Sequence, residues 1–163
     1  MLTSGYVSDG QVVFFEGVDK IYQREYQHEK ISSVTIPETV TAIQSEAFAH
    51  CTSLTSIVIP DSVKKISTRC FDGCTGLKKV VLPSGVKVID EYVFYGCTGL
   101  EEIVIPDSVT KIARGAFSGC SSLSKVILPG KLKTIGKNAF RGCKLESIAF
   151  PDSLETIEMD AFA

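Results

Sequence analysis

The chain has 163 residues, of which 44% are hydrophobic and 22% are charged, the composition of an ordinary globular domain with one buried core. Its formal net charge of −2 at pH 7 gives no field that would attract nucleic acid or an anionic membrane, so neither partner is expected. The longest apolar runs, such as residues 12–15, have the length of a strand, and no membrane insertion is predicted.

Residues 1–30 precede a regular pattern and are predicted to form an N-terminal cap. Residues 6–17 read YVSDGQVVFFEG, a strand, an Asp-Gly turn and a second strand, which is the signature of a β-hairpin. Such a hairpin would cover the open first coil of a repeat array. The segment has no basic stretch followed by an apolar one, so we expect an intracellular chain or a removed secretion signal.

Residues 31–163 carry an internal repeat that is marked by a recurring proline. A period in this range predicts a solenoid in which each repeat is one coil stacked on its neighbours. Parallel strands joined by crossovers predict a right-handed coil. The prolines follow one another at intervals of 23 residues, and finally 22, at Pro37, Pro60, Pro83, Pro106, Pro129 and Pro151.

Each unit reads L-x-x-I/V-x-I/L-P-x-x-V/L-x-x-I-x-x-x-A-F-x-G-C. Its first half, which includes Ile103 and Ile105, is rich in branched residues and predicts a strand that the proline ends. The second half has Val109, Ile112 and Phe117 at spacings that predict a short helical or 3-10 return segment. The predicted fold is therefore an α/β solenoid with a parallel sheet on one face. A positive φ is expected at Gly73, Gly96, Gly119 and Gly142.

Two rows of residues are predicted to line the shared interior of the stacked coils. Phenylalanine recurs once per coil and should form one buried aromatic column. A row of mostly small residues precedes it and tolerates only modest volume. The column comprises Phe48, Phe71, Phe94, Phe117, Phe140 and Phe162, and the small row comprises Ala47, Cys70, Val93, Ala116, Ala139 and Ala161.

The repeat unit is similar to the leucine-rich repeats of the BspA type, which occur in bacterial and protozoan surface proteins. Six consecutive units fit, from Ile31 onward, and the last is incomplete. The resemblance implies adhesion or protein binding at a cell surface. Proline after the strand and the lack of an asparagine row depart from the commoner leucine-rich consensus, which predicts a flatter solenoid. Because the chain stops after Phe162, we expect a cut through a longer array or an end that is covered otherwise.

Six cysteines leave three interpretations open. Buried free thiols are favoured because cysteine serves well as a small hydrophobe. Disulfides between coils are disfavoured because stacked side chains point in parallel, and zinc lacks four converging ligands. His28 is predicted to occupy the cysteine position of the coil before Cys51. No metal or other cofactor is expected.

The sequence carries no pattern of catalytic residues. Its two histidines, His28 and His50, are not accompanied by a nucleophile motif such as G-x-S-x-G. No glycine-rich phosphate-binding loop is present. We therefore expect no enzymatic activity.

The outward side of the predicted strands is the candidate partner-binding surface. The residue between the two inward aliphatic residues of each strand must point outward, and it is mostly apolar. Charged residues stand beside this stripe. The candidate residues are Thr35, Val58, Val81, Val104 and Ile127, with Lys79, Glu102 and Lys125 beside them; Ala149 continues the stripe. Branched residues suit any strand, so a purely structural role is the alternative.

Three functions follow, and the first is a recognition module that binds protein, peptide or glycan on the strand face. In the second, the last coil packs against another copy or a further domain through Leu154, Ile157 and Phe162, which would give a homo-oligomer or a structural segment of a larger protein. A thiol or metal function is the third. The resemblance indicates a cell-surface or secreted location, whereas unpaired cysteines suit the cytoplasm.

Overall fold

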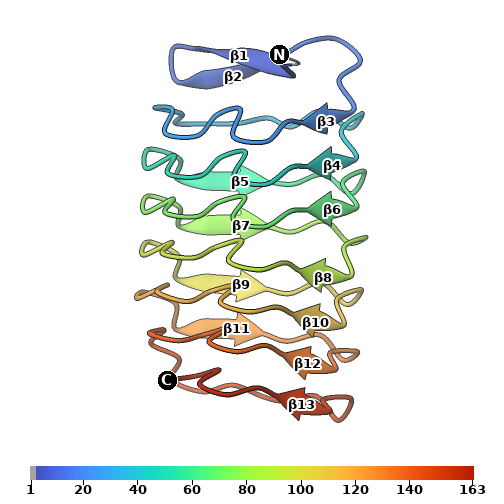
Figure 1. The fold of residues 1–163 in the computed structure, drawn as a ribbon, viewed down its shortest axis with the longest axis vertical. Coiled ribbons are helices and arrows are strands. Elements are labelled where there is room, and N and C mark those ends of the chain that lie inside the picture. The colour runs from blue at the N-terminus through green and yellow to red at the C-terminus, as the bar shows by residue number, and fades with distance from the viewer. Residues whose placement is uncertain (1–2) are drawn as a thin grey trace.

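The computed structural model describes residues 3–163. The chain winds through a stack of similar coils, with strand β1 at one end of the long axis and β13 at the other (Figure 1). Neighbouring coils pair through short parallel strands. Their buried residues form one hydrophobic cluster that runs the length of the stack. The fold is a parallel β-solenoid, as the repeat predicts.

One side of the solenoid, called here the strand face, is built from four three-residue strands. In each strand the middle residue is buried and its two neighbours are exposed, because successive side chains point to opposite sides of a strand. β5 pairs with β7, and β9 pairs with β11, in parallel register. Within residues 3–163 no ladder pair joins β7 to β9. The strands are β5 (Ser56–Val58), β7 (Lys79–Val81), β9 (Glu102–Val104) and β11 (Lys125–Ile127).

Two-residue strands form a second side, called here the second face. They make one sheet of order β3-β4-β6 and another of order β13-β12-β10-β8. The second face is thus interrupted between β6 and β8, one coil before the interruption on the strand face. Its strands are β3 (Lys20–Ile21), β4 (Ala42–Ile43), β6 (Lys65–Ile66), β8 (Val88–Ile89), β10 (Lys111–Ile112), β12 (Thr134–Ile135) and β13 (Thr156–Ile157).

The prediction of helical or 3-10 return segments is wrong. Residues 3–163 contain no helix, and each return segment is a two-residue strand followed by turns. A left-handed residue recurs two positions before the phenylalanine, as at Tyr92 (φ 56°) and Gly115 (φ 62°), and it interrupts any helix there. Backbone groups bond to the next coil instead: the Phe94 N–H donates to the Ala116 carbonyl over 2.9 Å.

The predicted aromatic column is confirmed. Five of its six rings are at most 1% exposed, from Phe48 to Phe140, and Phe162 at the end is 39% exposed. Consecutive ring centroids lie 5.3–5.6 Å apart with planes within 11° of each other. Tyr26 extends the column by stacking on Phe48 at 5.4 Å. The small row beside it is buried throughout, and the four predicted glycines have φ between 66° and 77°.

The predicted N-terminal hairpin is confirmed. β1 (Gly5–Ser8) pairs antiparallel with β2 (Gln11–Phe14) around Asp9 and Gly10, which both have positive φ as a two-residue hairpin turn requires. The Glu25 carboxylate joins this hairpin to the first coil, because it accepts hydrogen bonds from the backbone N–H and hydroxyl of Ser4. The boundary at residue 30 stays a prediction, and parallel pairing between coils begins earlier, at β3.

The prediction that His28 occupies the cysteine position is wrong by one residue. The His28 ring stacks on the His50 ring with centroids 4.7 Å apart, and both residues have positive φ, as Gly73 has at the same position of the next coil. The first coil is one residue shorter than the next: fewer residues separate Tyr26 from Ile31 than separate Phe48 from Leu54. Glu29 therefore occupies the cysteine position, and the histidines form an exposed pair on the turn edge.

Candidate functional site

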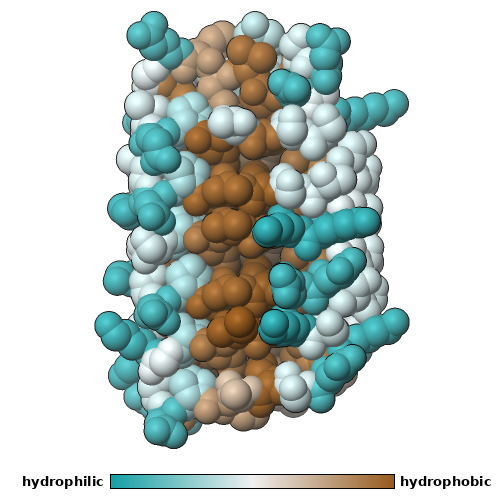
Figure 2. Space-filling view, turned by 180° about the vertical axis from the view of Figure 1, so that it is seen from behind, coloured by the Kyte–Doolittle hydropathy of each residue, from teal (hydrophilic) through white to brown (hydrophobic). Residues whose placement is uncertain are grey.

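The predicted apolar stripe is exposed along the strand face. Val58, Val81, Val104 and Ile127 are 63%, 43%, 58% and 48% exposed, and Thr35 and Ala149 are exposed at its two ends. Seen from behind, the molecule carries an apolar band along its long axis with polar side chains on both sides (Figure 2). Parallel register places Val58 beside Val81 and Val104 beside Ile127. The stripe is thus a continuous surface that no other described segment covers.

The three predicted charged residues flank this stripe at the first position of their strands. Lys79, Glu102 and Lys125 are all exposed. Lys125 Nζ lies 4.0 Å from Glu102 Oε2, and about two thirds of each side chain is in solvent, so the pair contributes little to stability. These charges stay available to a partner.

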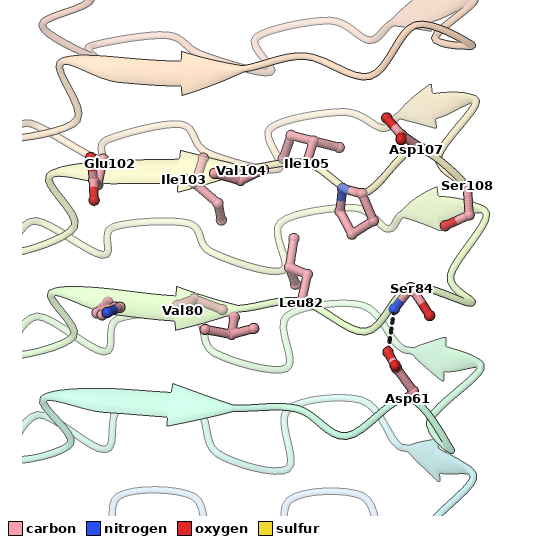
Figure 3. Close-up of a pocket in the computed structure, with 13 residues that line it drawn as sticks. Asp61, Val80, Leu82, Ser84, Glu102, Ile103, Val104, Ile105, Asp107 and Ser108 are labelled. Carbon is pink, nitrogen blue, oxygen red and sulfur yellow. Dashed lines mark hydrogen bonds between the residues drawn. The ribbon is translucent and has the colours of Figure 1, made fainter.

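A groove of about 540 Å³ opens where the strand face is interrupted, between β7 and β9 (Figure 3). Its apolar lining includes Val81, Leu82 and Val104, whereas Asp61 and Asp107 lie at one end. At that end the Ser84 backbone N–H donates to Asp61 Oδ1 over 2.7 Å, and this bond lowers the pKa of Asp61.

Sequence analysis found only part of this groove. It identified Lys79, Val81, Glu102 and Val104 as outward residues but not the residues around the turn that follows each strand. The reason is that a missing hydrogen-bond ladder has no counterpart in the amino-acid pattern. The lining residues not identified as site residues were Asp61, Val80, Leu82, Ser84, Ile103, Ile105, Pro106, Asp107 and Ser108.

The cysteines form a ladder of thiols along the interior. All six are free, and five are buried whereas Cys143 is partly exposed. The Cys74 thiol donates to the Phe48 carbonyl at 3.1 Å, and four other coils repeat this contact. Burial raises the pKa of Cys51 and of Cys143 to about 12, so these thiols stay protonated at neutral pH. The interpretation as buried free thiols is the one that the structure shows.

Within the part of the chain that the structure describes, no group of three or more histidine, cysteine, aspartate or glutamate side chains is placed to hold a metal ion. The same residues include no helix with the length and apolar character needed to cross a membrane.

The last coil exposes a second apolar surface, called here the C-terminal end. Ile157 and Phe162 are 47% and 39% exposed, whereas Leu154 is partly buried against the core. Phe150, which sequence analysis did not identify, meets the edge of the Phe162 ring at a centroid distance of 5.9 Å. Met159 is also exposed. The three predicted residues thus lie on one end of the stack, with Leu154 less available than predicted.

The comparisons with known proteins agree with this architecture. A model of the BspA type leucine rich repeat region matches six copies, over residues 19–124 and 41–163. A search of the curated proteins gave no significant match.

Solved structures of bacterial leucine-rich repeat proteins share the fold. A leucine-rich repeat protein from Eubacterium ventriosum is 28% identical to this chain, with a TM-score of 0.88. The match covers 95% of this chain and 42% of that protein's chain. A leucine rich cell surface protein from Faecalibacterium prausnitzii is 30% identical, with a TM-score of 0.74, and the match covers 96% of this chain and 39% of that protein's chain. The chain therefore spans less than half the length of these two proteins.

A third structure is matched over most of its own length. The leucine-rich repeat protein of T. pallidum is 32% identical with a TM-score of 0.81, and the match covers 86% of this chain and 70% of that one. Together with the six matched copies, this establishes that the chain belongs to the BspA-type leucine-rich repeat family.

Proposed function

We propose that the chain is a non-enzymatic interaction module that binds a protein, peptide or glycan partner on its strand face, in an adhesion role at a cell surface. One observation carries this proposal: the apolar stripe stays exposed along the strand face of a chain whose other aliphatic rows are buried. Exposed apolar surface of this extent marks interaction sites in soluble proteins. Similarity to a bacterial cell surface protein supports the location.

A constant interior with a varied exterior also supports binding. The buried positions of each coil repeat phenylalanine, leucine and cysteine, whereas the outward positions beside the stripe change between lysine, glutamate and serine. Variation confined to the exterior is what a recognition surface built from repeats requires.

Selection from a random peptide library displayed on phage, with a glycan array in parallel, tests the proposal. Each selected ligand is measured on single variants of the strand face: Val58→Asp, Ile127→Asp, Lys79→Glu, Glu102→Lys and Lys125→Glu. Lys65→Glu and Lys111→Glu on the second face are matched controls, since both lysines are exposed. We expect each ligand to lose about tenfold in affinity on at least one strand-face variant and to keep its affinity on the controls, at unchanged melting temperature. Ligands that bind every strand-face variant normally would place the site elsewhere.

A second candidate function is assembly through the C-terminal end, which the exposure of Phe150, Ile157, Met159 and Phe162 favours. Here the surface would pack against another copy of the chain. Sedimentation velocity over a concentration series is expected to show dimers that Ile157→Lys removes. A strictly monomeric chain would exclude this function.

A further inference from the structure

The two halves of the strand face are separated by an interruption in backbone hydrogen bonding. On either side of it, the Ile59 N–H donates to the Val81 carbonyl at 3.0 Å and the Ile105 N–H donates to the Ile127 carbonyl at 2.9 Å. Among the described residues no equivalent bond joins Leu82 to Val104, and no ladder pair joins β7 to β9. The Leu82 N–H and the Val104 carbonyl are therefore not joined as the equivalent groups of the two halves are.

The groove at this interruption has the length of an extended peptide segment. The part of its lining before the turn follows the chain from Glu102 to Pro106, which corresponds to about 13 Å at 3.3 Å per residue. Glu102 marks one end, and Asp107 and Ser108 the other (Figure 3). A peptide of about four residues in extended conformation fits along this part.

The lining favours a peptide over a carbohydrate. Aliphatic side chains, among them Val81, Leu82 and Val104, form the apolar part, and no aromatic ring is present on which a sugar could stack. The groove therefore suits an inserted aliphatic side chain of a peptide.

Charge at one end of the groove favours a basic residue next to that apolar side chain. Asp61 already accepts the Ser84 N–H and is close to Lys64, which contributes to the lowering of its pKa. Asp107 is exposed and makes no ion pair or side-chain hydrogen bond with residues 3–163. It follows Val104 by three residues, about 10 Å along the strand direction.

We propose that the groove between β7 and β9 binds an extended segment of a partner protein, with an aliphatic side chain inserted between Val81 and Val104 and a lysine or arginine paired with Asp107. The proposal rests on the proposed function and narrows its partner from any ligand of the strand face to a peptide of this chemistry.

Fluorescence anisotropy with the full chain tests this with defined probes. The first probe is fluorescein-labelled Gly-Ser-Thr-Leu-Thr-Arg-Thr-Arg-Ser-Gly, and the second is the reversed sequence, which covers the opposite peptide direction. Two comparison peptides replace leucine by serine, or both arginines by glutamate. We expect saturable binding of one probe and a loss of about tenfold or more with each matching comparison peptide.

Matched variants locate the binding on the chain. Val104→Asp should weaken the bound probe about tenfold or more, whereas Val58→Asp, at an equally exposed position outside the groove, should change it less than about twofold. Asp107→Asn should weaken it about fivefold, whereas Asp152→Asn, in the same Pro-Asp-Ser turn of another coil, should not.

Two outcomes would overturn the proposal. One is the absence of saturable binding by both probes up to about 1 mM. The other is equal weakening by Val58→Asp and Val104→Asp, which would mean that the whole stripe binds rather than the groove. In either case the phage selection on strand-face variants decides separately whether the proposed function holds.

Discussion

At the residue scale, one backbone position in every coil combines a left-handed conformation with ordinary side chains. Glu46, Arg69, Tyr92 and Asn138 occupy it with φ between 56° and 59°. Among the equivalent positions of the coils, only position 115 carries glycine. The reason is that the Tyr92 ring of the preceding coil covers this position, so that a Cβ there would lie 2.4 Å from a ring carbon. The neighbouring coil, rather than the backbone angle, therefore requires this glycine.

Replacing Gly115 by alanine should consequently cost more than the left-handed conformation alone. That conformation costs an L-residue about 1–2 kcal/mol, and the displaced Tyr92 ring, which packs under Arg69 at 4.6 Å, adds to it. Urea denaturation of Gly115→Ala is expected to show a loss of about 2–4 kcal/mol in the free energy of unfolding. In a Tyr92→Ala background the same change should cost only the conformational part. An equal cost in both backgrounds would contradict this account.

Stability should also fall at alkaline pH because of the buried thiols. An unfolded cysteine ionises near pH 8.5, whereas burial holds the pKa of Cys51 at about 12. Above about pH 8.5 the unfolded chain releases protons that the folded chain keeps, so the free energy of unfolding decreases as the pH rises toward 12. Urea titrations at about pH 7.5 and pH 10 measure the decrease. Cys97→Ala removes one buried thiol and should make the decrease smaller; an identical decrease would assign it to other groups.

At the element scale, the Glu25 carboxylate joins the Ser4 end of the hairpin to the solenoid, and the Ser32 N–H, which donates to the Gly10 carbonyl over 2.7 Å, joins the turn of the hairpin to it. Glu25 accepts hydrogen bonds from both polar groups of Ser4, from the Gly5 N–H at 3.3 Å and from the Tyr22 N–H at 3.0 Å. The buried Ser4 hydroxyl also lies 2.9 Å from the Tyr26 hydroxyl. These bonds connect β1 to the coil that it covers.

Glu25→Gln should loosen the hairpin, because the amide keeps one acceptor oxygen but turns its NH₂ group toward donors. We expect faster hydrogen exchange of the amides in β1 and β2, with a local loss of about 1–3 kcal/mol. Glu29→Gln, at an exposed position on the following turn, is the matched control and should leave exchange unchanged. Unaltered exchange in Glu25→Gln would show that the carboxylate does not hold the cap.

The sequence predicts the strands of the strand face better than those of the second face. Proline and the branched residues bound segments such as Ile103 to Ile105, so their alternation was recognisable. A two-residue strand such as Lys111–Ile112 is too short for any period, and the apolar spacing there fits a helix equally well. The left-handed residues that exclude a helix are mostly not glycine, so the sequence gives no signal of their backbone conformation. The interruption between β7 and β9 depends on pairing between coils and leaves no signal within either coil.

At the scale of the whole molecule, the aromatic column passes from Tyr26 to Phe162 without a break, and so do the hydrogen bonds that the backbone N–H of each buried aromatic residue donates to the next coil. Phe94 and Phe117 stack at 5.4 Å across the joint where β7 and β9 do not pair. Three interactions therefore connect the two coils at that joint. They are the ring packing, the backbone hydrogen bonds such as that from the Phe94 N–H to the Ala116 carbonyl, and the strand pair β8–β10.

Removing one ring from the middle of the column should be far more costly than removing the last. Phe94→Ala leaves a cavity in a fully buried site and is expected to cost about 3–5 kcal/mol. Phe162→Ala removes a ring that is 39% exposed, and we expect less than half that loss. Equilibrium urea unfolding of both variants compares them directly. Equal losses would mean that the column does not act as a single core.

The two interruptions place the ladders of two successive joints on opposite faces of the solenoid. The coil between them is tied to the preceding coil by β5–β7 and to the following coil by β8–β10, and lacks the opposite ladder at each joint. When the solenoid bends, the joint before this coil would open on the second face and the joint after it on the strand face. A partner bound in the groove between β7 and β9 would therefore resist opening of the second of these joints.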